Sequence, residues 1–243
     1  MIQIYSLRLD QELNEKEQQQ ALDILTPERK AKALRFRRLE DQSRSLAAGV
    51  LEAYALWKSF GISKEERKIQ KGEQGKPYLP THEKTQYNLS HSGAWVVCGT
   101  SDSPLGIDVE QARKYQERLV KRFFHPDEVE DILNHPESER PYIFAEYWTM
   151  KESFMKLCGT GFALSLSNFH TDRESGRVAI LPGIKEDIML QLKALGISEE
   201  TNPYCRQIPL EKEYACMVCT LEDQEIMVEP VSLKECIEAL INV

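Results

Sequence analysis

The sequence lacks any apolar run of the ~20 residues that a membrane-spanning helix needs. Its first residues lack the apolar core and the small-residue cleavage site of a signal peptide. Internal repeats and low-complexity tracts are also absent. We therefore expect a cytoplasmic globular protein without a membrane segment. The 243 residues, 41% of them hydrophobic, suffice for one large or two small domains with a real core.

A net positive charge is also lacking. The chain has 31 basic and 39 acidic residues, a formal charge of -8, which argues against broad, sequence-blind binding to nucleic acid. The charge is nevertheless segregated along the chain. Residues 29–44 hold seven Arg or Lys against two acids, and residues 111–125 hold five against one. This segregation indicates a phosphate-rich substrate and an acidic partner.

The six cysteines do not follow a disulfide or zinc-finger spacing. The one close pair, Cys216 and Cys219, lies in an apolar run that is typical of a strand. Residues three apart on a strand point to opposite faces, so this pair cannot share a metal ion. We expect buried free thiols.

Helical and strand patterns are mixed without strict βαβ alternation, which indicates the α+β class. No strand–GxGxxG–helix unit and no Walker loop are present, which argues against a Rossmann dinucleotide site and a P-loop site. One helix is predicted to begin at Thr26, and further helices are predicted at 43–60, 140–158, 185–195 and 232–241. Residues 111–134 are predicted to be helical or mixed. Strands are predicted at 1–9, 86–91, 94–100, 105–110, 166–171, 177–181, 204–209 and 214–220.

The segment 106–110 (GIDVE) is the first motif that suggests chemistry. On a strand, Ile107 and Val109 face the core, while Asp108 and Glu110 share the other face. Two carboxylates on one face can hold Mg²⁺ through oxygen ligands. The alternative is a half-buried strand with a solvated acidic face, and the motif taken alone favours that alternative.

The predicted helix 140–158 carries the second motif. At ~100° per residue its large apolar side chains gather on one face, and these are Phe144, Tyr147, Trp148, Phe154, Met155 and Cys158. Lys151 falls in the middle of this face, where a lysine is costly unless its amine reaches water or a partner. Glu152 and Lys156 flank the edge and resemble an exposed helix pair worth roughly 0.2–0.5 kcal/mol. That interpretation leaves Lys151 unexplained, and the misfit favours a functional site.

The third motif places Ser90 beside His91 in the segment 87–93 (YNLSHSG). A hydrolase is disfavoured, because neighbours on a strand point in opposite directions and the G-x-S-x-G elbow is absent. Near a polyanion, the hydroxyl and the imidazole are good phosphate donors. Lys76, between Gly75 and Pro77, adds a cation on a loop.

Together these features predict a Mg²⁺ site formed by Asp108, Glu110 and Glu152. The cations expected around it are Arg29, Lys32, Arg44, Lys76, His91 and Lys156. Such a site suits a substrate with several phosphates, one pair of which is bridged by the metal.

The motifs resemble the 4′-phosphopantetheinyl transferases, and in particular the surfactin-synthetase-activating (Sfp-type) family. The matching segments are Gly75-Lys76-Pro77, Asn88-x-Ser90-His91-Ser92, Gly106-Ile107-Asp108-x-Glu110 and Trp148-x-x-Lys151-Glu152-Ser153-x-x-Lys156. Each is weak alone, but their order and spacing agree along nearly the whole chain. Two departures are small: Arg29 stands where the family has lysine, which bears on contacts to the 3′-phosphate, and Val109 separates the two acids.

The resemblance implies a pseudo-twofold fold of two similar α/β halves, with coenzyme A bound in the cleft between them. The halves would be residues 1–103, with the nucleotide contacts, and 104–243, with the metal site and carrier docking. It implies transfer of 4′-phosphopantetheine to a serine of an apo carrier protein, with release of adenosine 3′,5′-bisphosphate. A monomer is implied by comparison with the short, trimeric carrier-synthase type. The carriers would be peptidyl, acyl or aryl carrier domains of non-ribosomal peptide (antibiotic), polyketide or fatty-acid synthesis.

The resemblance also implies a role for each site residue. Asp108, Glu110 and Glu152 would hold Mg²⁺ on the pyrophosphate. The nucleotide end and the 3′-phosphate would be bound by Arg29, Lys32, Arg44, Lys76, Ser90 and His91, with Lys156 near the reacting phosphate. Glu152 is the candidate base for the carrier serine, directly or through a water, and Lys156 would stabilise or protonate the departing phosphate.

Two further points stay open from the sequence. The second basic cluster is Arg113, Lys114, Arg118, Lys121 and Arg122, followed by Phe123 and Phe124. It is either a solvated helix face over a core aromatic pair or a docking surface for an acidic carrier. Competing functions are a non-catalytic carrier- or coenzyme A-binding module and another Mg²⁺-dependent phosphoryl or nucleotidyl transferase.

Overall fold

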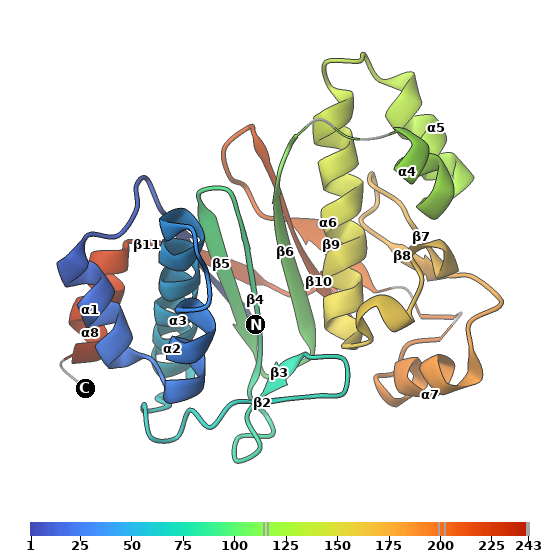
Figure 1. Ribbon diagram of the computed structural model, residues 1–243. Coiled ribbons are helices and arrows are strands. Elements are labelled where there is room, and N and C mark those ends of the chain that lie inside the picture. The colour runs from blue at the N-terminus through green and yellow to red at the C-terminus, as the bar shows by residue number, and fades with distance from the viewer. Residues whose placement is uncertain (114, 116, 199, 202, 242–243) are drawn as a thin grey trace. The chain divides into compact units, whose positions relative to one another are not determined.

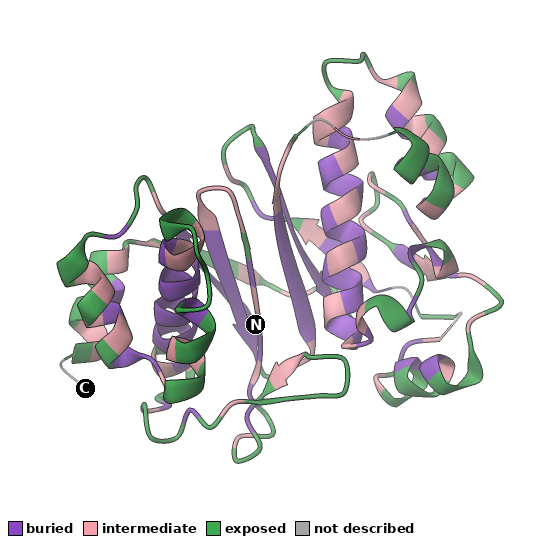
Figure 2. Cartoon of the chain, viewed as in Figure 1, coloured by how far each residue is buried: buried purple, intermediate pink, exposed green. Residues whose placement is uncertain are grey.

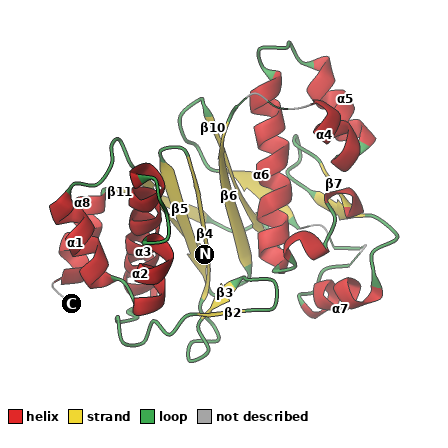
Figure 3. Ribbon diagram, viewed as in Figure 1, coloured by secondary structure: helices red, strands yellow, loops and turns green. Residues whose placement is uncertain are grey.

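The computed structural model describes residues 1–113, 115, 117–198, 200–201 and 203–241 (Figure 1). Helices are mixed along the chain with sheets that contain antiparallel strand pairs and the parallel pair of β1 (Ile2–Arg8) and β11 (Ile226–Val231), so the predicted α+β class is confirmed (Figure 3). The chain divides into two compact units. Unit 1 comprises Met1–Gln70, Pro77–Asp102 and Glu225–Val243, and unit 2 comprises Lys71–Lys76 and Ser103–Gln224.

Unit 1 is built on a four-stranded sheet in the order β11-β1-β5-β4. The strands are β1 (Ile2–Arg8), β4 (Gln86–Ser92), β5 (Trp95–Ser101) and β11 (Ile226–Val231). The helices are α1 (Glu15–Ile24), α2 (Pro27–Ala33), α3 (Leu39–Phe60) and α8 (Leu233–Ile241). The long helix α3 packs on the sheet and is buried along most of its length between Ser43 and Leu56 (Figure 2). It ends at Gly61, whose φ of 69° is the left-handed conformation that a glycine adopts readily.

Unit 2 has the three-stranded antiparallel sheet β6-β10-β9. Its strands are β6 (Leu105–Gln111), β9 (Tyr204–Gln207) and β10 (Tyr214–Thr220), with a separate pair β7 (Phe169–Thr171) and β8 (Val178–Ile180). Its helices are α4 (Glu117–Phe123), α5 (Pro126–Asn134), α6 (Arg140–Cys158) and α7 (Glu186–Ala194). Two short strands, β2 (Gln70–Lys71) and β3 (Pro77–Tyr78), form a two-stranded sheet of their own. The helix α6 packs on β6 and β10.

The structure differs from the predicted elements in several places. The helix α1 and the strand β11 were not predicted, and residues 166–168 form a 3₁₀ turn before β7. The helix α3 begins at Leu39, so Arg44 lies on α3, after a break that follows α2. The segment Glu225–Val243 belongs to unit 1, because β11 pairs with β1 and α8 packs on α3. The sequence analysis grouped that segment with the second half.

The six cysteines are free and buried, as expected. Within the described part of the chain, no helix combines the length and the apolar character needed to cross a membrane.

Candidate active site

The predicted acidic strand is β6, and Gly106 brings it into direct contact with α6. A Cβ atom at Gly106 would lie 2.0 Å from the Ser153 carbonyl oxygen and 2.3 Å from the Leu157 amide nitrogen. Only a residue without a side chain permits this approach. Because side chains alternate on a strand, Asp108 and Glu110 share the face of Gly106 and point towards the α6 side.

Asp108 is buried rather than solvated, with an exposed fraction of 4%. It accepts a hydrogen bond at 2.6 Å from the Lys156 ammonium of α6, which also donates to the Ile107 carbonyl oxygen at 3.3 Å. The interpretation of this strand as one with a solvated acidic face is therefore wrong at Asp108. The helix α6 covers that face.

Glu152 of α6 completes the carboxylate cluster, which we define as Asp108, Glu110 and Glu152. Burial, together with the neighbouring carboxylates of Asp108 and Glu110, raises the pKa of Glu152 above its ordinary value, although the Lys156 ammonium opposes the shift. A buried carboxylate whose pKa is raised by two neighbouring acids gains from a bound cation. The structure thus brings together the four residues that the sequence assigned to the metal and to the chemistry.

Lys76 belongs to unit 2 and lies at the end of α6. Its ammonium donates to the Leu157 carbonyl oxygen at 2.9 Å and to the Leu105 carbonyl oxygen at 3.2 Å. Burial lowers the pKa of Lys76 to about 8. A lysine at the carbonyl end of a helix also interacts favourably with the helix dipole.

The remaining predicted site residues lie in unit 1. Arg29 of α2 forms an ion pair with Glu52 of α3 at 3.5 Å, and Lys32 is exposed on α2. Arg44 of α3 donates to the Gly93 carbonyl oxygen at 2.8 Å and pairs with Asp41 and Glu40. Gly93 directly follows β4, so Arg44 lies at the end of the strand that carries Ser90 and His91. On this strand Ser90 is buried and His91 is exposed.

Lys151, the misfit on the apolar face of α6, is part of a buried ion pair. Its ammonium lies 2.9 Å from the Glu128 carboxylate of α5, and both side chains are fully buried. It also donates to the carbonyl oxygens of Leu166 and Phe169, each at 3.0 Å. Its contacts are thus structural: the side chain joins α6 to α5 and to the segment that leads into β7.

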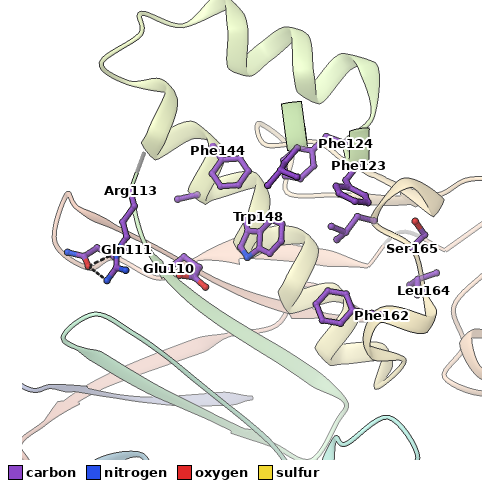
Figure 4. Close-up of a pocket in the computed structure, with 13 residues that line it drawn as sticks. Glu110, Gln111, Arg113, Phe123, Phe124, Phe144, Trp148, Phe162, Leu164 and Ser165 are labelled. Atoms are coloured by element: carbon purple, nitrogen blue, oxygen red, sulfur yellow. Dashed lines mark hydrogen bonds between the residues drawn. The ribbon is translucent and has the colours of Figure 1, made fainter. Parts of the chain in front are cut away.

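An apolar pocket of about 610 Å³, which the sequence analysis did not identify, borders Glu110 (Figure 4). Aromatic side chains from α6 and from the end of α4 line it, and they are Phe144, Trp148, Phe123 and Phe124. Leu119 and Phe162 lie at the pocket with exposed fractions of 47% and 78%. The aromatic face of α6 was assigned to the core, and Phe162 in a glycine-containing loop carried no recognisable motif. The sequence signal that could have indicated this pocket is the spacing of Phe144 and Trp148, which lie one helical turn apart.

The second basic cluster follows β6 and includes α4. Arg113 lines the apolar pocket and donates two hydrogen bonds to the Gln111 side chain, at 3.0 and 3.3 Å. Lys121 pairs with Glu117 at 2.5 Å, and the Arg122 guanidinium lies 5.1 Å from the ring centre of Phe123. Lys114, also assigned to this cluster, lies outside the described residues. The cluster is thus partly a solvated helix face and partly the rim of an apolar pocket.

The chain matches two adjoining sequence profiles of one enzyme family. The profile described as 4'-phosphopantetheinyl transferase, N-terminal, covers residues 12–103, and that of the 4'-phosphopantetheinyl transferase superfamily covers residues 104–219. The chain is 33% identical over 180 residues to the 4'-phosphopantetheinyl transferase Sfp of Bacillus subtilis, which covers 74% of this chain and 80% of that protein.

A further relative and a solved structure were also compared with the chain. The 4'-phosphopantetheinyl transferase psf-1 of Bacillus pumilus is 34% identical over 172 residues, 69% of this chain and 73% of that protein. The crystal structure of Thermotoga maritima holo-[acyl-carrier-protein] synthase is 18% identical, with a TM-score of 0.35 over 50% of this chain and 64% of that chain. By its profiles and by the extent of its likeness to the Bacillus enzymes, the chain belongs to the 4′-phosphopantetheinyl transferase superfamily.

Proposed function

We propose that this enzyme transfers the 4′-phosphopantetheine group from coenzyme A to a serine hydroxyl of an apo carrier protein. Adenosine 3′,5′-bisphosphate is the second product. The single observation that carries the proposal is the carboxylate cluster on β6 and α6, with Lys156 held 2.6 Å from Asp108. The names of the two Bacillus relatives, both 4'-phosphopantetheinyl transferases, support it.

The donor set of the carboxylate cluster fits Mg²⁺. Asp108, Glu110 and Glu152 offer only oxygen ligands, which this hard cation prefers. The pKa of Glu152 is raised by burial and by the other two acids, so a divalent cation relieves an unfavourable charge there. When bound, Mg²⁺ would neutralise charge on the pyrophosphate of coenzyme A.

The side chains of α6 supply the proton chemistry in this proposal. The carrier serine oxygen attacks the phosphorus that bears the pantetheine arm, and the bond from that phosphorus to the oxygen of the departing nucleotide phosphate breaks. Glu152 accepts the serine proton, directly or through a water, and its raised pKa suits a base better than an ordinary glutamate would. Lys156 supplies positive charge to the departing phosphate.

The nucleotide end of coenzyme A is assigned to the cations of unit 1 and to Lys76. Arg44 is held in place by the Gly93 carbonyl oxygen next to the strand of Ser90 and His91, which suits a fixed phosphate contact. Arg29 and Lys32 lie one helical turn apart on α2, and we propose that both contact the 3′-phosphate. A guanidinium at Arg29 offers a planar, two-pronged contact that an ammonium lacks.

The apolar pocket is proposed as the docking surface for the carrier. Exposed Leu119 and Phe162 lie at an apolar hollow that borders Glu110 and Arg113. The helix α4, which contributes Leu119 to this hollow, also carries basic residues. An acidic carrier with an apolar face complements this combination, because charge steers the encounter while apolar contact retains the partner. In this proposal the basic cluster belongs to the docking surface.

The test is the mass of the carrier after incubation with the enzyme, coenzyme A and Mg²⁺. We expect the apo carrier to gain the mass of one phosphopantetheine group, and a carrier whose acceptor serine is replaced by alanine to gain nothing. Coenzyme A, but not ATP, should protect the enzyme against thermal unfolding. No gain of mass across peptide-synthetase, polyketide and fatty-acid carriers would overturn the proposal, and protection by ATP instead would indicate a nucleotidyl or phosphoryl transferase.

A further inference from the structure

A second group of side chains able to ligate a metal ion lies away from the carboxylate cluster. His125, Asp127 and His170 each offer one ligand atom, and these three atoms lie within 4.8 Å of one another. The two imidazole rings have their centres 4.6 Å apart and are tilted by 54°. We call these three residues the histidine cluster.

The histidine cluster joins two elements that are distant in the sequence. His125 is the residue before α5 and caps its N-terminus, Asp127 lies in the first turn, and His170 is the central residue of β7. His125 accepts the hydrogen bond of the Asp127 amide through Nδ1 at a long 3.4 Å. Because this cap bond is weak, engaging the imidazole with a metal ion costs the helix little.

One buried carboxylate holds the two histidine-bearing segments in register. Glu128 accepts the amide hydrogen of His125 on Oε2 at 2.9 Å. Its other oxygen, Oε1, accepts from the amide and the hydroxyl of Thr171, both at 2.7 Å, and from the Lys151 ammonium at 2.9 Å. The residues next to both imidazoles are thus fixed by a fully buried group, so the ligands are preorganised rather than gathered by chance on a mobile surface.

The charges around the histidine cluster also suit a cation. Asp127 and Asp172 line a small hollow of about 200 Å³ together with His170. Arg173 lines the same hollow, but its guanidinium donates to Asp131 at 3.1 Å and to Glu146 at 3.3 Å. The positive charge of that arginine is therefore already balanced by two other carboxylates.

We propose that His125, Asp127 and His170 form a binding site for a transition-metal ion of the zinc class. Two imidazoles and one carboxylate are ligands for Zn²⁺ and its first-row neighbours, whereas Mg²⁺ takes oxygen ligands. Three protein ligands leave coordination positions for water. The ion ties α5 to β7, directly after Phe123 and Phe124, and so it steadies the segment that forms one wall of the apolar pocket.

The test is calorimetric titration of the full-length protein with Zn²⁺ in excess Mg²⁺, which keeps the carboxylate cluster from competing. We expect one tight Zn²⁺ equivalent. His125→Asn removes the imidazole but keeps a residue that caps helices well, and His170→Gln removes the second ligand. Each should weaken zinc binding at least tenfold, while His82→Gln, a partly exposed histidine of unit 1, should leave it unchanged. Circular dichroism verifies that the variants are folded.

The absence of zinc binding to the wild-type protein at micromolar concentration would overturn the proposal, and so would wild-type affinity in both His125→Asn and His170→Gln. Asp108→Asn separates this site from the proposed catalytic one, because it should keep the zinc affinity even though it impairs transfer. Substitution by Co²⁺ gives a second readout. Its visible spectrum should show nitrogen and oxygen ligation, and a thiolate charge-transfer band would assign the metal to cysteines instead.

Discussion

At the scale of single residues, the buried pair of Lys151 and Glu128 explains a feature that had favoured a functional site. Burial lowers the pKa of Lys151, and Glu128 counteracts that shift. The ammonium also lies 4.5 Å from the ring centre of Phe169 and 5.4 Å from that of Phe124. The sequence indicated that Lys151 needs a partner but gave no means to choose Glu128, which lies on another helix. The lysine on the apolar face of α6 therefore marks a structural ion pair.

Removing one partner of this pair should be costly, because the other charge is left buried. We expect Lys151→Met to lower the free energy of unfolding by about 3–5 kcal/mol. The double variant Lys151→Met/Glu128→Gln should recover part of this loss. Urea unfolding measures both, with Lys193→Met on the exposed side of α7 as the neutral control. A loss below about 1 kcal/mol in the single variant would show that Glu128 carries no uncompensated charge.

The amine of Lys76 makes the free energy of unfolding depend on pH in the alkaline range. Its pKa is lowered by burial from 10.5 to about 8, so the folded chain releases this proton before the unfolded chain does. Between these two values the unfolded state binds more protons, and stability therefore rises with pH. The free energy of unfolding of the wild type minus that of Lys76→Met should increase from pH 8 to pH 10. A flat or falling difference would contradict the buried placement of this amine.

At the scale of elements, the contact of β6 with α6 decides the geometry of the carboxylate cluster. The alternation of Ile107 and Val109 with Asp108 and Glu110 was predictable from the strand period. The burial of Asp108 under α6 was not, because it depends on the close approach at Gly106 of two elements far apart in sequence. Glu152 and Lys156 were correctly placed one turn apart on a helix, but the pairing of Lys156 with Asp108 is a tertiary contact.

Gly106→Ala tests this contact. The added methyl group meets backbone atoms rather than a flexible side chain, so α6 must shift away from β6. We expect a loss of stability of about 3 kcal/mol or more and a loss of transfer activity under conditions where the variant is still folded. Gly72→Ala is the matched control, since its nearest neighbour would be the Lys76 carbonyl oxygen at 3.7 Å. Equal stability of the two variants would contradict the close packing.

Two elements that were not predicted, α1 and β11, escaped prediction for different reasons. Asn14 and Glu17 form a capping box that starts α1, a signal that was present and overlooked. The strand β11 contains Pro230, which ordinarily argues against a strand. It is tolerated because β11 is an edge strand, whose one neighbour among the described strands is β1. Its partner strand β1 lies at the opposite end of the chain, so a local sequence pattern does not indicate the pairing.

At the scale of the whole molecule, the charge of -8 conceals separate basic regions. The positive charges of the first region, residues 29–44, are partly balanced by acids within unit 1. Examples are the ion pairs of Arg29 with Glu52 and of Arg44 with Asp41. In the second basic region, Arg113 lines an apolar pocket that also has the exposed side chains of Leu119 and Phe162. The position of the charges along the chain indicated a class of substrate, and the structure added the apolar surface.

The docking proposal predicts a dependence on charge that does not involve the chemical step. Arg118→Glu/Arg122→Glu should raise the KM for an acidic carrier about tenfold and leave kcat within about twofold, because rim charges act mainly on encounter. The effect should shrink as salt is added. Steady-state kinetics at low and high salt measure it, with Lys193→Glu on α7 as the control for net charge. A fall in kcat at unchanged KM would place α4 in the chemistry rather than in docking.

The central claim is that the carboxylate cluster holds the Mg²⁺ used in phosphopantetheine transfer. The most direct measurement is the rate at which an apo carrier gains mass as Mg²⁺ is titrated, for the wild type, Asp108→Asn and Glu137→Gln, the last being an exposed acid of the same unit. We expect a rate that vanishes with EDTA and returns with Mg²⁺ in the wild type and Glu137→Gln, and a rate lower by on the order of 100-fold or more in Asp108→Asn. A wild-type rate and Mg²⁺ dependence in Asp108→Asn would contradict the assignment.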